Sequence, residues 1–180
     1  MARLDPLAPP YAPEIAEELA RLMPPGLPPI ALFRTVAHNP RVLARWRGGA
    51  LLDKGSICLR QREIVILRTT ARLGAEYEWG VHIAFFAQKA GLSAAERAAT
   101  VHAGPAAWSG TEAVLVRIVD ALVDEATLGD ELWVEAAGHF APAQMIEILS
   151  LVGFYHLVSF VVNATGVAGE PGAPGFPAAA

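Results

Sequence analysis

The sequence predicts an all-α fold, and three features indicate it. Apolar residues recur every three or four positions through most of the chain, as on the buried face of a helix. No run of alternating apolar and polar residues is long enough to predict a strand. Glycines and prolines stand where such helices would end or begin. We therefore expect one helical domain built around one core.

Length and composition support this class and exclude others. The chain has 180 residues, 53% of them hydrophobic and 18% charged, so it can bury a substantial core and is not intrinsically disordered. A net charge of −4 gives no reason to expect nucleic-acid binding. The single cysteine, Cys58, excludes an internal disulfide framework and a cysteine-based metal site. The N-terminus has no apolar stretch of the secretory kind, which favours a cytoplasmic protein.

Composition divides the chain into three regions. Residues 1–30 are rich in proline and contain one short amphipathic helix over 14–23, which predicts an arm wrapped on the body or on a neighbouring subunit. Residues 31–166 carry the helical patterns of the main domain. Residues 167–180, with the sequence VAGEPGAPGFPAAA, are predicted to form a flexible C-terminal tail.

Start and stop signals define the helices of the domain. Proline is tolerated in the first turn of a helix, so Pro40 marks a beginning. Gly74 and Gly91 mark ends, and Ser93 with Glu96 three residues later forms a capping box. In order, helices are expected over 31–38, from Pro40, over 59–74, over 77–91, from Ser93, after Thr111, over 129–140 and from Pro142.

The final helix contains an apolar run, 145–162, whose length approaches that of a membrane span. A span needs about 20 mostly apolar residues. This run is interrupted by Glu147, Ser150, His156 and Ser159. We therefore expect a buried or subunit-interface helix and no membrane contact.

Charge is unevenly distributed along the chain. Nine basic residues and two acids lie between residues 34 and 72, whereas eight acids and one base lie between 112 and 147. Two solvated faces of opposite sign would explain this pattern. A basic rim for an anionic ligand, or complementary surfaces between subunits, would also explain it.

Three titratable residues lie in strongly apolar helices. Glu78 and His82 are four residues apart in the helix over 77–91, so they share one of its faces, and Glu63 lies on an apolar face of the preceding helix. Consecutive helices joined near Gly74 are expected to pack antiparallel. A rise of about 1.5 Å per residue then places Glu63 and His82 within one turn of the same height. We predict that the three side chains meet.

Two carboxylates and an imidazole in an apolar surrounding are suited to proton transfer. Burial raises carboxylate pKa values, and an imidazolium stabilises whichever acid stays ionised. One group can then serve as an acid and another as a base near neutral pH. The alternative is a satisfied buried network that only fixes helix packing.

Two stretches, HNPRVLARW and REIVILRTTARLGAEYEWGVHIAFFAQKAGLS, resemble the carboxymuconolactone decarboxylase family, which also contains the alkyl hydroperoxidase D-like proteins. The resemblance runs from about Phe33 to Glu96. It implies the all-α, alkyl hydroperoxidase D-like helical bundle, assembled as a homo-oligomer of three or six subunits. It also implies a site near a subunit interface.

The thiol peroxidases of this family are similar in a pattern of Glu, then Cys-x-x-Cys, then His. Glu63 and His82 match the ends of that pattern, but Ala75 and Glu78 stand at the cysteine positions. Peroxide reduction by that route needs a thiolate and a resolving partner. A cysteine-dependent peroxidase is therefore excluded.

What remains resembles the decarboxylase-like members, in which YEWxxH replaces the cysteine pair. This implies a lyase of aromatic-compound catabolism that removes carbon dioxide from a small carboxylated lactone or related ring metabolite, without a metal or organic cofactor. His82 and Glu78 would then carry the proton, and Glu63 would orient or charge-balance His82. An arginine of the basic stretch would bind the anionic substrate. The pocket would be lined by Tyr77, Trp79 and Phe86.

Two other functions stay open beside this one. The chain could be a non-catalytic helical oligomer in which the Glu/His cluster is structural, or a small-molecule binding protein that keeps the pocket without the reaction. A metal site is not expected, because EWGVH supplies two ligands and a catalytic zinc site usually needs three.

Overall fold

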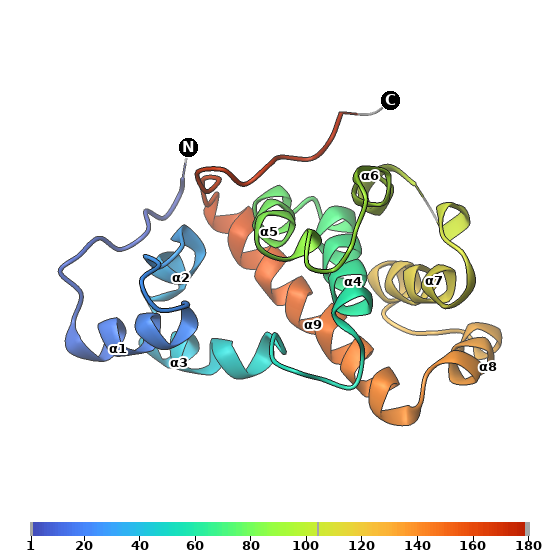
Figure 1. Ribbon diagram of the computed structural model, residues 1–180. Helices are drawn as coiled ribbons and strands as arrows, with labels where there is room; N and C mark the ends of the chain where they lie inside the picture. The colour runs from blue at the N-terminus through green and yellow to red at the C-terminus, as the bar shows by residue number, and fades with distance from the viewer. Residues whose placement is uncertain (1, 104, 179–180) are drawn as a thin grey trace.

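The computed structural model describes residues 2–103 and 105–178, and within these residues it consists of helices without strands (Figure 1). The all-α prediction is confirmed. A π-helical turn, Ile83–Ala87, follows α5, and a short 3-10 turn, Pro105–Ala107, precedes α7. In chain order the α-helices are α1 (Pro13–Leu22), α2 (Ala31–Val36), α3 (Pro40–Gly49), α4 (Leu59–Arg72), α5 (Glu76–His82), α6 (Ala94–His102), α7 (Gly110–Glu125), α8 (Asp130–His139) and α9 (Pro142–Thr165).

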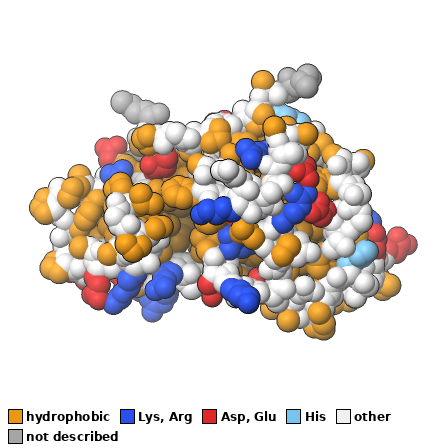
Figure 2. All heavy atoms as spheres, viewed as in Figure 1, with side chains coloured by type: hydrophobic (Ala, Val, Ile, Leu, Met, Phe, Trp, Pro, Cys, Tyr) orange, Lys and Arg blue, Asp and Glu red, His pale blue; other side chains and the backbone are white. Residues whose placement is uncertain are grey.

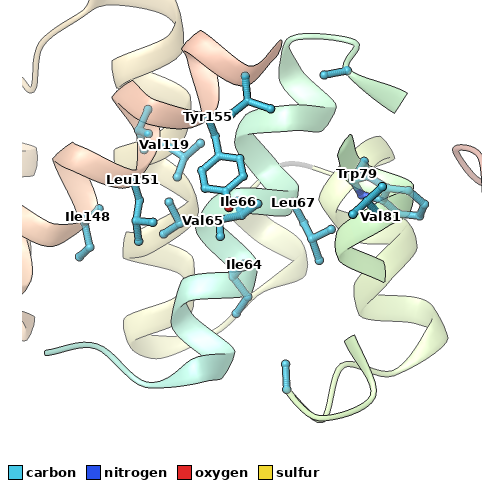
Figure 3. Packing of buried hydrophobic residues seen from close by; sticks show 14 of the residues in the cluster. Ile64, Val65, Ile66, Leu67, Trp79, Val81, Val119, Ile148, Leu151 and Tyr155 are labelled. Atoms are coloured by element: carbon cyan, nitrogen blue, oxygen red, sulfur yellow. The ribbon is translucent and has the colours of Figure 1, made fainter. Parts of the chain in front are cut away.

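Helix α4 lies at the centre of the fold. All its residues from Arg62 to Thr70 are buried, and α5, α6, α7 and α9 pack against it. Figure 3 shows side chains of α4 between Tyr155 of α9 and Trp79 of α5. Because the helix is covered on every side, its polar residues are buried together with its apolar ones. This explains why Glu63, in the middle of α4, has no exposed surface.

Helix ends follow the local signals. Gly74 and Gly91 both adopt a positive φ, +64° and +68°, at the ends of the helices that they were expected to terminate. The Ser93 side chain accepts from the backbone of Glu96, and the Glu96 side chain accepts from the backbone of Ser93. The predicted capping box is therefore confirmed.

The helix expected over 77–91 begins at Glu76 and changes character after His82. There the chain makes the π-helical turn, which the sequence did not predict. A π-helical turn widens the helix and is frequent at functional sites. It directly follows the histidine whose surroundings are described below.

Helix α9 crosses the molecule diagonally between α1–α3 on one side and α6–α8 on the other (Figure 1). It is long and apolar enough to span a membrane by length and composition. In this fold it serves as a core helix, because Ile148, Leu151, Tyr155 and other residues of one face are buried and α4 packs against it.

The segment after α9, expected to be a flexible tail, makes specific contacts along α5. It passes over α5 toward α6 in Figure 1. The Tyr77 hydroxyl of α5 donates to the Glu170 carboxylate at 2.7 Å, and the Phe176 ring packs against Trp79 with centroids 5.5 Å apart. Residues 179–180 of this segment lie outside the described part of the chain.

Candidate active site

The structure brings together Glu63 of α4 with Glu78 and His82 of α5. The His82 imidazole lies between the two carboxylates, with Nδ1 2.8 Å from Glu63 Oε2 and Nε2 3.4 Å from Glu78 Oε1. The exposed fractions of Glu63, Glu78 and His82 are 0%, 5% and 2%. We call these three residues the Glu–His cluster. Its imidazole contacts two carboxylates in a site almost free of solvent.

Two further residues complete the surroundings of the cluster. Arg62 Nε donates to Glu63 Oε1 at 2.9 Å, and its guanidinium carbon lies 5.1 Å from the centre of the Phe86 ring. On the other side, the Tyr155 hydroxyl of α9 is 3.1 Å from His82 Nε2. With both carboxylates ionised, Arg62 and a protonated His82 balance their charge.

Sequence reasoning did not place Arg62 in this group. Arg62 directly precedes Glu63 on α4, and neighbouring side chains on a helix point about 100° apart, but the long Arg62 side chain can fold along the helix to reach the neighbouring carboxylate. Tyr155 lies 73 residues from His82, so no spacing rule connects them. The only signal for Tyr155 was its place in the apolar final helix, which had to pack against the domain core.

The protonation states follow from these contacts. Burial by itself lowers the pKa of His82, but the charge of Glu63 and its hydrogen bond, together with Glu78, raise that pKa to about 9. A protonated His82 donates from Nδ1 to Glu63 and directs its Nε2–H toward Tyr155 and Glu78. Burial, and then the charges of Glu78 and Glu63, raise the pKa of Tyr155 well above its usual value. The imidazole is therefore charged at neutral pH, and Tyr155 is neutral.

A cavity of about 870 Å³ adjoins the cluster. Helices α1–α3 form one wall, and α5 and α9 contribute the others. Figure 2 shows hydrophobic side chains gathered over the N-terminal helices on the left and in the recess beside them. The cavity is lined by Glu18, Arg21, Leu22, Phe33, Ala44, Trp46, Arg47, Gly48, Ala50, Leu51, Leu52, Asp53, Glu78, Phe154, Tyr155 and Val158.

Glu78 and Tyr155 connect the cluster to this cavity. Both line it, whereas Glu63 and His82 lie behind them. Within the described residues, Glu78 Oε2 is a buried oxygen without a hydrogen-bond partner. Buried polar atoms are usually satisfied, so an unpaired carboxylate oxygen beside a cavity is available for a ligand.

The structure does not bring the three expected pocket residues into this cavity. The Tyr77 hydroxyl accepts from the backbone of Leu32 at 3.0 Å, and Trp79 Nε1 donates to Thr100 Oγ1 at 2.9 Å. Phe86 packs on the His82 ring, away from the cavity lining. Neighbours on a helix point about 100° apart, so Tyr77 and Trp79 diverge to either side of Glu78. Aromatic walls come instead from Phe33, Trp46 and Phe154.

One segment of the chain matches a known protein family. Residues 38–123 match the model of the carboxymuconolactone decarboxylase family. This segment belongs to that family. The matched segment contains α3 to α6 and most of α7, so all three residues of the Glu–His cluster lie inside it. Tyr155, which completes the site, lies outside it.

Solved structures share the fold of this chain. A peroxidase-related protein of uncharacterized function from Silicibacter sp. TM1040 has a TM-score of 0.80 at 15% identity, over 96% of this chain and 93% of that chain. A second peroxidase-related protein, described as an alkylhydroperoxidase AhpD core from Ralstonia eutropha JMP134, has 0.79 at 14%, over 93% of each chain. The debrominase Bmp8 in its apo form has 0.69 at 16%, over 94% and 93%. No curated protein matches the chain.

The Glu–His cluster of this chain contains no thiol. Cys58, the one cysteine of the chain, is exposed and precedes α4. Within the described residues, no three His, Cys, Asp or Glu side chains are arranged to hold a metal ion. Of the Glu–His cluster, the Glu78 carboxylate lines the cavity and the His82 imidazolium lies behind it, where the two can exchange a proton.

Proposed function

We propose that this chain is a cofactor-independent decarboxylase or related lyase that acts on a small carboxylated lactone or similar ring metabolite. One observation carries the proposal. Glu78 belongs to a buried Glu–His cluster, yet it lines a cavity and keeps one oxygen unpaired. In a purely structural network, most buried oxygens are paired. Membership of the carboxymuconolactone decarboxylase family supports the reaction class.

The positions of Glu78 beside the cavity and His82 behind it suit acid–base catalysis. In the proposed reaction the bond between a ring carbon and the substrate carboxylate breaks, carbon dioxide leaves, and the electron pair is delocalised into the lactone carbonyl. The Glu78 carboxylate takes a proton from the His82 imidazolium and passes it to the resulting carbanion, so Glu78 ends ionised and His82 neutral. Solvent protons recharge His82 after product release. The charge of Glu63 keeps His82 protonated between turnovers.

Tyr155 suits the role of a neutral partner in this transfer. Its hydroxyl lies 3.1 Å from His82 Nε2, where it accepts from the imidazolium and, after a rotation, donates to the neutral imidazole. The raised pKa of Tyr155 prevents it from becoming a competing anion. The imidazole therefore keeps a partner in both protonation states.

Arg47 is our choice for the residue that binds the substrate carboxylate. The basic residues that line the cavity are Arg21 and Arg47. Arg21 already forms ion pairs with Glu17 and Glu18, whereas the ion pairs of the described residues do not include Arg47. An arginine that is free of internal partners can bind a carboxylate through two parallel hydrogen bonds.

We also propose that the chain associates with a second copy of itself. Ile146, Leu157 and Phe160 of α9 are exposed by 64%, 44% and 63%. With Ser150 and Gly153 they form a stripe with alternating spacings of four and three residues, as in a paired helix seam. Light scattering of the wild type and of Phe160→Asp tests this. A monomeric wild type would contradict it.

The substitution Glu78→Gln tests the catalytic proposal. It preserves the volume of the side chain but removes its ability to transfer a proton, so carbon dioxide release from a carboxylated lactone should fall about 10²- to 10⁴-fold. The melting temperature should fall only slightly, because Glu78 Oε2 has no partner to lose and the contact of Oε1 with His82 Nε2 is long, at 3.4 Å. Glu131→Gln on α8 is the matched control. Full activity of Glu78→Gln on a lactone that the wild type converts would contradict the mechanism.

The same measurement separates the two alternatives. If the wild type binds carboxylated lactones without converting any, the chain is a binding protein. If Glu78→Gln unfolds the chain and no lactone binds, the cluster is structural. Peroxide reduction is the weaker candidate despite the peroxidase-related neighbours, because Cys58 does not line the cavity.

A further inference from the structure

The short helix α2 depends on distant residues for its first hydrogen bonds. Its six residues begin at Ala31, and the residue before it, Ile30, offers no side-chain cap. The first N–H groups of a helix need acceptors from outside it. Here the Ala31 N–H donates to the Glu170 carboxylate, and the Leu32 N–H donates to the Tyr77 hydroxyl at 3.0 Å. The acceptors are 139 and 45 residues away.

Glu170 and Tyr77 form one unit at this point. The Tyr77 hydroxyl donates to the same Glu170 oxygen, Oε1, that accepts from Ala31. Tyr77 is 9% exposed, so this unit is largely shielded from water. A charge-assisted hydrogen bond in such a place is stronger than one on an open surface. The C-terminal segment therefore joins α2 to α5.

The hydrogen bonds that join α2 to α5 lie next to the candidate active site at both helices. Tyr77 immediately precedes Glu78, the carboxylate that lines the cavity. Leu32 immediately precedes Phe33, which lines the opposite wall. Helix α2 itself packs on α1 and α3, the N-terminal helices that form that wall. The Glu170–Tyr77 pair thus links the part of α2 that carries Phe33 to the part of α5 that carries Glu78.

The rest of the C-terminal segment is attached to the outer side of α5. The backbone N–H of Phe176 donates to Glu76 Oε1 at 2.7 Å, and the Phe176 ring packs edge-on against Trp79. A Cβ atom at Gly80 would lie 2.2 Å from the carbonyl oxygen of Pro174. The chain therefore touches the helix directly at Gly80, and a side chain there would separate them.

We propose that residues 167–178 are a strap that holds the α2 wall of the cavity in place, with Glu170 as a positioning residue. Through Tyr77, Glu170 holds α2 and Phe33 in place opposite Glu78. When the strap is released, the Ala31 N–H loses its acceptor and the Tyr77 hydroxyl loses the carboxylate that positions it for Leu32, so α2 moves and the cavity opens for ligand exchange. The catalytic consequence rests on the proposed function, whereas the opening of the cavity does not depend on any reaction.

Hydrogen exchange measured by mass spectrometry tests the strap in the full-length protein. Glu170→Ala should accelerate exchange in peptides covering residues 29–36 about tenfold, because the Ala31 N–H loses its acceptor and the Tyr77 hydroxyl, which accepts from Leu32, loses the carboxylate that positions it. Exchange in α4 should not change. Glu170→Gln should restore slow exchange, since its amide oxygen still accepts from Ala31 and Tyr77. Glu125→Ala, at an exposed site on α7, is the control.

A ligand provides the second readout. The probe is 5-oxotetrahydrofuran-2-carboxylate, a saturated carboxylated lactone, with binding and dissociation followed by NMR. Glu170→Ala should raise its dissociation rate about tenfold, and Glu170→Gln should not. The strap proposal is overturned if hydrogen exchange in α2 of Glu170→Ala is unchanged, or if it rises equally in α2 and α4. If hydrogen exchange in the two Glu170 variants changes as predicted but the wild type converts no lactone, only the proposed reaction is overturned.

Discussion

The Glu63 carboxylate and the His82 imidazole form a 2.8 Å hydrogen bond between two consecutive helices, with 0% and 2% of their side chains exposed. This contact does more than fix the packing of α4 on α5. Because water is excluded, the negative charge of Glu63 acts strongly on the imidazole and overcomes the effect of burial on its pKa. The properties of the site depend first on this pair.

Removing the charge of Glu63 should change His82 most. In Glu63→Gln we expect the pKa of His82 to fall from about 9 toward or below its usual value of 6.5, since burial lowers it and only Glu78 still raises it. The unfolding free energy should fall on the order of 3 kcal/mol, because Arg62 loses its buried partner. NMR titration and urea denaturation measure the two effects. A His82 pKa that stays near 9 contradicts this account.

Stability should decline as the pH rises from neutral to alkaline values. The pKa of His82 is raised above its unfolded value, so its contribution is complete below about 6.5 and is lost as the pH rises through about 9. The total loss is on the order of 3 kcal/mol. Urea denaturation across this range, with Glu63→Gln as the reference, isolates the effect of His82. If the unfolding free energies of the wild type and Glu63→Gln depend equally on pH, His82 does not make this contribution.

Tyr155→Phe should separate catalysis from stability. The substitution removes a hydroxyl 3.1 Å from His82 Nε2 and keeps the ring in its buried site. We expect kcat to fall about tenfold and the unfolding free energy to fall by about 1 kcal/mol. Tyr11→Phe, at a residue outside the cavity lining, is the control. An unchanged kcat would remove Tyr155 from the proposed transfer.

Arg47→Ala tests the recognition of the substrate carboxylate. The dissociation constant of 5-oxotetrahydrofuran-2-carboxylate should rise about tenfold, whereas that of its uncharged methyl ester should stay the same. The control, Arg45→Ala, changes an exposed arginine of the same helix that does not line the cavity. Similar losses for the acid and the ester would assign Arg47 a steric role.

Gly80→Ala should weaken the attachment of the C-terminal segment to α5. The added Cβ would lie 2.2 Å from the Pro174 carbonyl oxygen, so backbone must move and the unfolding free energy should fall by about 1 to 3 kcal/mol. Gly138→Ala on α8 meets open space and should be neutral or slightly stabilising. Thermal denaturation compares the two variants. Equal stability of Gly80→Ala and the wild type would show that the C-terminal segment does not contact Gly80 closely.

Much of the fold and part of the site could be predicted from local patterns. The spacing of apolar residues determines which segments are helical, and residues such as Ser93 and Gly91 determine where helices begin and end, because these effects act within one or two turns. The same reasoning predicted that Glu63, Glu78 and His82 meet, since they lie on two consecutive helices with a short connection. The structure places their side chains in contact.

The remaining parts of the site depend on residues that are far apart in the chain. The contact of Tyr155 with His82, the aromatic walls of the cavity and the attachment of Glu170 to α2 all join elements whose relative positions follow from the packing of the whole core. Local pattern contains no information about such distances. By itself, then, the sequence determined the helices, their ends and the pair of helices that carries the Glu–His cluster. Only the tertiary structure decided which side of α5 faces the cavity and which side holds the C-terminal segment, because that choice depends on how α2 and α9 pack around it.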